Sequence, residues 1–235
     1  MTDSRMQVVK LGNELGVDAE ELAFLLPLPA DTVRDLRHLV AEAVFARHEA
    51  RFLRLAKVSG IAPPGITAKI AEAALGPLLA ARTAAVMRVD VAVQLASKLR
   101  PDFLTDLTVR LDPTRAEPIV RALPADLVVD VGRRLLERGD FLTLGRFVAI
   151  VDTEISLRVV ETADDEQLLE VALFTEDEAA LEAVVAALPD DRVSDVLAAA
   201  SDRDQDLATL LASASGEARA RLERLLQTAT GGGAP

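Results

Sequence analysis

The stretch Leu123–Val131 reads LPADLVVDV, and five copies of this nine-residue phrase recur along the chain. In each copy the fourth and eighth positions are acids and the sixth and ninth are aliphatic. The other four copies begin at Leu28 (LPADTVRDL), Leu99 (LRPDFLTDL), Ala163 (ADDEQLLEV) and Leu188 (LPDDRVSDV). Recurrence of one short unit is typical of helical arrays, in which each unit packs only against its neighbours.

Each phrase has the features of a helix start. Proline at the first helical position has no N–H to leave unpaired, and an acid in the first turn meets the positive end of the helix dipole. The two aliphatic residues, three apart, form a buried stripe. Ala and Leu dominate a chain that is 50% hydrophobic, and neither an Asn-Gly nor an Asp-Gly turn occurs. We therefore predict an all-α fold: a superhelical array of short antiparallel helices preceded by longer N-terminal helices.

The chain divides into four expected parts. Residues 1–58 form N-terminal helices, and Ala30 to Lys57 read as one helix with a kink near Val44 to Arg47. Residues 59–65 (SGIAPPG) break the chain, because paired prolines and glycines cannot continue a helix. Residues 66–229 form the array, continuous with the N-terminal part, and residues 230–235 form a disordered tail. Short repeats are expected from 99 onward, where helix starts recur at Asp102, Thr114, Asp126, Asp140, Thr153 and Asp165.

The second acid of each phrase is not needed for a helix start. Two acids at i and i+4 repel by a few tenths of a kcal/mol, as with Asp31 and Asp35. One interpretation is a solvated outer face that tolerates this cost. The other is an acidic ridge that binds Mg²⁺-like ions or a basic partner, with weak Mg²⁺ as the one cofactor considered. The candidate metal residues are Asp102, Asp106, Asp126, Asp130, Glu166, Glu170, Asp191 and Asp195.

Residues 99 to 200 resemble a known family. The segment LPADLVVDVGRRL (Leu123 to Leu135), with LRPDFLTDL and LDPTRAEPIV before it and LPDDRVSDVL after it, is similar to the superhelical cytosolic N-terminal domain of MgtE-type magnesium transporters. The helical repeats of the flagellar switch protein FliG are a more distant likeness. In the transporters this domain precedes a nucleotide-binding-like module and a membrane pore, and its acidic surface helps to sense Mg²⁺. Neither part follows here, so the resemblance implies a stand-alone interaction domain.

Charge limits the class of partner. The net charge is −12, yet residues 1–120 hold 15 basic and 15 acidic side chains, whereas residues 121–235 hold 11 and 23. Nucleic acid is therefore an unsuitable ligand for the acidic half, and a protein with a basic surface suits it better. Homo-oligomers are left open.

The chain has no cysteine, no signal-peptide pattern and no uncharged apolar span, so we expect a cytoplasmic protein without a transmembrane segment.

Motifs for catalysis are missing. His38 and His48 lie ten residues apart and cannot share a metal on one helix, and His48 begins an H-E-x-x-H pattern that ends in Phe52. The run Asp202, Asp204 and Asp206 lacks the glycine and the final glutamate of a calcium loop. No phosphate-binding glycine loop or nucleophile motif occurs. We expect no enzyme activity and no catalytic residue.

An alternative function comes from the apolar segment Ile66 to Met87. Its wide apolar surface suits either a hydrophobic-ligand pocket or a peripheral contact with a membrane, and Arg47, Arg51 and Arg54 form a basic stripe nearby in sequence. The competing interpretation is a central core helix whose small residues allow close packing. The main expectation remains a non-catalytic protein–protein interaction or scaffold domain, with a divalent-cation response left open.

Overall fold

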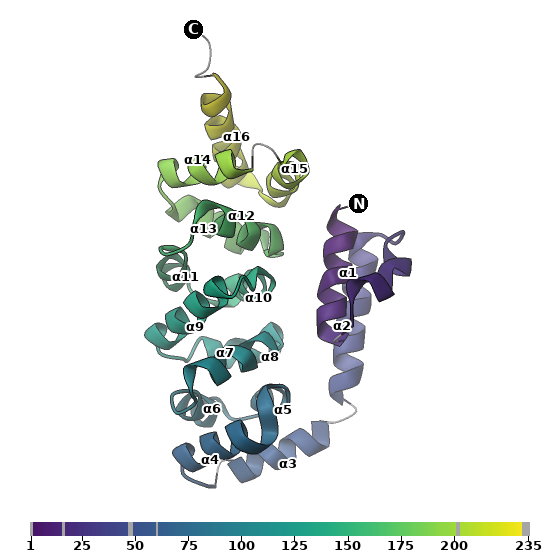
Figure 1. Ribbon diagram of the computed structural model, residues 1–235, viewed down its shortest axis with the longest axis vertical. Coiled ribbons are helices and arrows are strands. Elements are labelled where there is room, and N and C mark those ends of the chain that lie inside the picture. The colour runs from purple at the N-terminus through teal and green to yellow at the C-terminus, as the bar shows by residue number, and fades with distance from the viewer. Residues whose placement is uncertain (1, 16, 47–48, 60, 201–202, 232–235) are drawn as a thin grey trace. The chain divides into compact units, whose positions relative to one another are not determined.

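The computed structural model describes residues 2–15, 17–46, 49–59, 61–200 and 203–231 (Figure 1). Within these ranges the chain forms sixteen α-helices and no strand, which confirms the predicted all-α fold. The chain separates into two compact units, Met1–Ala122 and Leu123–Pro235, which we call unit 1 and unit 2.

Unit 1 begins with longer helices and continues with short ones. Its α-helices are α1 (Thr2–Leu15), α2 (Ala30–Ala46), α3 (Glu49–Ser59), α4 (Pro64–Ile70), α5 (Gly76–Ala84), α6 (Val89–Ala96), α7 (Pro101–Val109) and α8 (Pro113–Val120). A 3₁₀ helix, η1 (Ala19–Leu25), follows α1, and a π-helical turn, η2 (Ala71–Leu75), joins α4 to α5.

Two kinds of packing build unit 1. Helices α1 and α2 form a pair with η1 around Val8, Leu11, Leu25 and Val33, all of which are buried. From α3 onward every second helix is in contact, so that α3, α5 and α7 form one row and α4, α6 and α8 form another. This is the packing expected of an array, because each helix is too short to be stable alone.

Unit 2 repeats that pattern. Its α-helices are α9 (Ala125–Glu137), α10 (Phe141–Phe147), α11 (Thr153–Val160), α12 (Asp165–Phe174), α13 (Glu178–Ala187), α14 (Asp190–Ala199), α15 (Asp204–Ser213) and α16 (Gly216–Gly231), with a short 3₁₀ helix, η3 (Val148–Ile150), after α10. Helix α9 packs on α11 and α11 on α13, while α10 packs on α12, α12 on α14 and α14 on α16 (Figure 1). The neighbouring helices share an aliphatic core that includes Val129, Leu136, Val159 and Leu168.

The repeated phrase starts a helix in every copy. Helices α2, α7, α9, α12 and α14 each begin at the third residue of the phrase, which confirms this prediction. The position of proline differs from the expectation. Pro101 is the first residue of α7, but Pro124 and Pro189 are N-cap residues, with extended ψ angles of 132° and 152°. Proline suits that position as well, because its fixed φ matches an extended cap and its missing N–H leaves no donor unpaired.

The predicted starts of the short helices are also confirmed. All six helices from α7 to α12 begin within one residue of the positions expected from the sequence. Side chains account for three of these starts: Asp112 accepts from the N–H of Thr114, Asp140 accepts from the N–H of Thr143, and Asp164 forms a capping box with Gln167.

Helices α2 and α3 cover the stretch Ala30 to Lys57 that was predicted as one helix. Residues 47–48 lie outside the described residues, so the kink expected near Val44 to Arg47 stays a prediction. One expectation about helix length was wrong: Ile66 to Met87 is not one core helix. It is divided by η2 and by Gly76. The φ angle of Gly76 is 71°, which glycine adopts readily and which strains residues that carry a Cβ atom. Short helices therefore begin at α4, well before residue 99.

The expected tail begins later than predicted. Helix α16 continues through Gly231, two residues into the segment 230–235. Residues 232–235 lie outside the described residues, so the predicted disorder stays a prediction there.

Candidate functional site

Arginines link successive repeats of unit 2 through the acids of the preceding repeat. Arg158 of α11 donates to Asp126 of α9 over 2.7 Å, and Arg203 donates to Glu170 of α12 over 2.6 Å. Two further pairs follow the same rule: Arg192 of α14 with Asp165 of α12, and Arg221 of α16 with Asp190 of α14. In all four pairs the arginine follows its acid by 27 to 33 residues.

Two of these arginines also bind the backbone at the connections between helices. Arg192 donates to the carbonyl of Ala163, just before α12. Arg221 donates to the carbonyls of Val185 and Leu188 at the end of α13, the latter over 2.7 Å. Carbonyls at the end of a helix have no partner within it, so a cation there satisfies them and meets the negative end of the dipole.

Several candidate metal residues are therefore held by arginine. Asp126 and Glu170 bind Arg158 and Arg203, and Asp130 accepts from Arg134 one turn further along α9 over 3.0 Å. The hydrogen bond to Glu170 raises the pKa of Arg203 above its usual value, so the guanidinium stays charged.

The remaining candidates are exposed and dispersed. Asp102 and Asp106 lie on α7 of unit 1, Glu166 on α12, and Asp191 and Asp195 on α14. Asp191 accepts from the N–H of Arg192. In the part of the chain that the structure describes, no three acidic or histidine side chains gather in a group that could hold a metal ion.

The other residues considered for chemistry are also separate. His38 is exposed on α2, and His48 lies outside the described residues, as do Arg47 and Asp202. Asp204 and Asp206 belong to the first turn of α15, where Asp206 pairs with Arg203 over 2.5 Å. A helix start accounts for both aspartates.

In unit 1 an acid outside the repeated phrase links two helices. Glu72 in η2 accepts from the backbone N–H of Arg100 over 2.6 Å and from its Nε over 3.0 Å. Arg100 is the N-cap residue of α7, so Glu72 caps that helix from a distant part of the sequence. The backbone hydrogen bond from Arg100, together with its side chain, lowers the pKa of Glu72 from its ordinary value.

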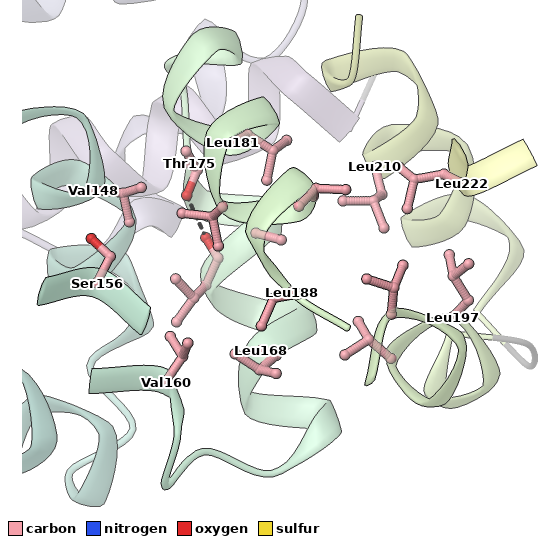
Figure 2. Close-up of a pocket in the computed structure, with 16 residues that line it drawn as sticks. Val148, Ser156, Val160, Leu168, Thr175, Leu181, Leu188, Leu197, Leu210 and Leu222 are labelled. Atoms are coloured by element: carbon pink, nitrogen blue, oxygen red, sulfur yellow. Dashed lines mark hydrogen bonds between the residues drawn. The ribbon is translucent and has the colours of Figure 1, made fainter. Parts of the chain in front are cut away.

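Unit 2 contains an apolar cavity of about 70 Å³ that is lined by residues from η3 to α16 (Figure 2). Ser156 and Thr175 are the polar residues among its sixteen lining residues, and the hydroxyl of Thr175 donates to the carbonyl of Val171 over 2.8 Å. Pockets for small ligands usually measure about 300–1,000 Å³. The cavity is accordingly a packing void between repeats, and it lies outside the segment 66–87 that the sequence suggested for a hydrophobic ligand.

The two units differ in surface character. Large aliphatic or aromatic side chains that are strongly exposed all belong to unit 1; the described part of unit 2 has none. Residues 123–235 contain 10 basic and 23 acidic side chains. Unit 2 therefore presents a polar, acidic surface, supported by the arginine pairs that join its repeats.

The arginines that join the repeats were not predicted from the sequence. The phrase contains the acids but not their partners, and the partners lie in the next repeats at variable positions. A search for arginine about 30 residues after each acid would have found Arg158, Arg192, Arg203 and Arg221.

Comparison with known protein families, characterised proteins and solved structures finds no match for the chain. None of the described helices has the length and apolar character needed to cross a membrane.

Proposed function

We propose that the protein is a non-catalytic scaffold that binds a partner protein through the acidic surface of unit 2. The observation that supports this most is the combination of a stacked helical array with 10 basic and 23 acidic side chains in residues 123–235. Stacked repeats present an extended face to a partner, and their helix-to-helix ion pairs hold that face in one shape.

The partner should carry a basic surface. Strongly exposed large apolar side chains are missing from the described part of unit 2, so recognition there depends on charge and hydrogen bonds. The resemblance of residues 99 to 200 to the cytosolic domain of MgtE-type transporters supports an interaction role as well. A divalent-cation response is not part of this proposal, since arginines already neutralise part of the acid pairs.

Crosslinking in the native host would identify the partner, and its affinity should then weaken as ionic strength rises. Salt screens exposed charges beyond roughly 8–10 Å at physiological concentrations. An affinity that is unchanged from low to high salt would contradict the electrostatic part of the proposal.

Two matched variants distinguish an effect of the unit 2 surface from an effect of the net charge of the chain. Each neutralises three exposed acids and thus changes the net charge equally. The array variant is Glu154→Gln, Glu166→Gln and Asp195→Asn; the control variant is Glu49→Gln, Asp90→Asn and Asp102→Asn. We expect the array variant to bind the partner about tenfold or more weakly and the control to bind normally. Equal losses in both variants would assign the effect to net charge alone.

A further inference from the structure

Unit 1 exposes two apolar surfaces, and they differ in charge. The first lies on η1 and α2, where Phe24 is 71% exposed and Leu39 is 69% exposed. The second lies on α3 to α5, where Ile61 is 83% exposed and Ile66 and Ile70 are each more than half exposed. Covering exposed apolar side chains of this size is favourable, so each surface is suited to a contact.

The surface on η1 and α2 is acidic. Glu20 and Glu21 precede Phe24 by about one turn, and Asp35 precedes Leu39 by four residues on α2. Residues four apart lie on the same side of a helix, so acid and apolar groups share this face. We call it the acidic apolar surface.

The repeated phrase supports the same assignment. Asp31 and Asp35 are the acid pair of its first copy, and among the described residues neither makes an ion pair, although Asp130 and Glu170 in later copies each bind an arginine. The first copy therefore lacks the arginine that the copies at Leu123 and Ala163 have at this position.

The surface on α3 to α5 is basic. Arg51, Arg54 and Lys57 are exposed at intervals of three on α3, and Lys69 is exposed between Ile66 and Ile70 on α4. We call it the basic apolar surface. Residues 51–100 hold eight basic side chains and two acids, and both acids bind arginines: Glu72 with Arg100 and Asp90 with Arg88. This basic region stands out in a chain of net charge −12.

We propose that the basic apolar surface of one molecule binds the acidic apolar surface of a second copy. The two surfaces are complementary in charge, and each would cover the exposed apolar side chains of the other. Because the surfaces differ, the contact is head to tail and continues to a ring or a filament.

Other occupants fit less well. Two basic apolar surfaces facing each other would bring Arg51, Arg54 and Lys57 against their own copies. The array of a second molecule offers acids but, within the described part of unit 2, no strongly exposed large apolar side chain. An anionic bilayer would cover the basic apolar surface, yet it would leave the acidic apolar surface bare and would repel the net negative chain.

Light scattering after size-exclusion chromatography tests the proposal on the full chain. We expect the mass to exceed 25.1 kDa and to rise with protein concentration. The variants Arg51→Glu/Arg54→Glu and Glu21→Arg/Asp35→Arg should each remain at the monomer mass, with thermal unfolding and circular dichroism confirming that they fold. The matched control Lys98→Glu/Arg110→Glu, also exposed in unit 1, should associate like the wild type.

Charge exchange gives the decisive result. An equimolar mixture of the two non-associating variants should associate again, because each retains the surface that the other has lost, and a chain carrying all four changes should associate with itself. A wild type that stays monomeric at every concentration, a mixture that stays monomeric, or loss of association in the control would overturn the proposal. Binding of monomeric wild type to phosphatidylglycerol vesicles through Arg51 and Arg54 would overturn it too and assign the surface to lipid.

Discussion

Gly132 of α9 lies directly against Val159 of α11, since a Cβ atom on Gly132 would stand 2.7 Å from Cγ2 of Val159. Gly145 of α10 approaches the backbone of Phe174 at the end of α12 in the same way, and a Cβ atom there would stand 2.6 Å from its carbonyl carbon. Each of the two rows of unit 2 thus has a glycine at a close contact between its helices.

Alanine at either glycine should destabilise unit 2. We expect Gly132→Ala to cost about 1–3 kcal/mol in unfolding free energy, because overpacking forces side chains from their positions. Gly145→Ala should cost more, since the clash is with backbone and a backbone cannot rotate away. Chemical denaturation measures both. The control is Gly65→Ala in α4, where an added Cβ atom would meet no packed neighbour within 4 Å, so that alanine should be neutral or stabilising. A similar loss of stability in all three variants would contradict the packing argument.

Arg221→Met should destabilise more than the loss of one surface ion pair. The side chain of Arg221 is 16% exposed, and its removal leaves the carbonyls of Val185 and Leu188 without this donor. Unpaired buried acceptors cost about 1–3 kcal/mol each. Asp190→Asn should cost less, because it removes only an exposed acid. The control Arg88→Met breaks the exposed pair with Asp90 and should be close to neutral; equal costs for Arg221 and Arg88 would show that the carbonyl contacts do not matter.

Glu72 should contribute to acid sensitivity. Its pKa is lower in the folded chain than its ordinary value of 4.5, so the folded state binds the proton more weakly than the unfolded state. The contribution of Glu72 to the free energy of unfolding is complete above its ordinary pKa. This contribution is lost as the pH falls through the pKa of Glu72 in the folded chain. Unfolding free energy measured from neutral pH downward should therefore fall less steeply below about pH 5 in Glu72→Gln than in wild type. The exposed control Glu20→Gln should keep the wild-type slope, and an unchanged slope in Glu72→Gln would refute the assignment.

Helix starts could be predicted from the sequence because their signals act within one turn. Proline, an acid and a capping side chain mark where α7 to α12 begin, although Glu72 also caps α7 from a distant part of the sequence. Contacts between repeats could not be predicted in this way. The approach of Gly132 to Val159 and the reach of Arg158 back to Asp126 depend on how helices stack, which the local pattern does not contain. The break at Gly76 was missed although the Gly-Pro pair at 76–77 is a turn signal, because the apolar run around it favoured a single helix.

Magnesium should raise the melting temperature no more than sodium does. Asp130 and Glu170 already bind arginines, and dispersed acids gain only screening from added salt. Thermal unfolding in MgCl₂ and NaCl at matched ionic strength should give equal shifts. The same should hold for a variant with Asp106→Asn, Asp130→Asn, Glu170→Gln and Asp195→Asn. A larger rise in melting temperature with Mg²⁺ than with Na⁺, seen in the wild type and lost in this variant, would instead establish a specific cation site. A ligand bound only to the folded state stabilises it by mass action.

Arg115→Lys should loosen the contact between α8 and α2 inside unit 1. The guanidinium of Arg115 lies 3.9 Å from the ring centre of Phe45 and donates to Glu42 over 2.7 Å. Lysine keeps the charge but lacks the flat guanidinium, which stacks on the ring and binds the carboxylate at the same time. We expect the free energy of unfolding to fall by about 1–2 kcal/mol. Hydrogen exchange should become faster in the last turns of α2 and stay unchanged in α14. Arg110→Lys, an exposed position at the end of α7, serves as the control; unchanged exchange in α2 of Arg115→Lys would show that charge alone holds these helices together.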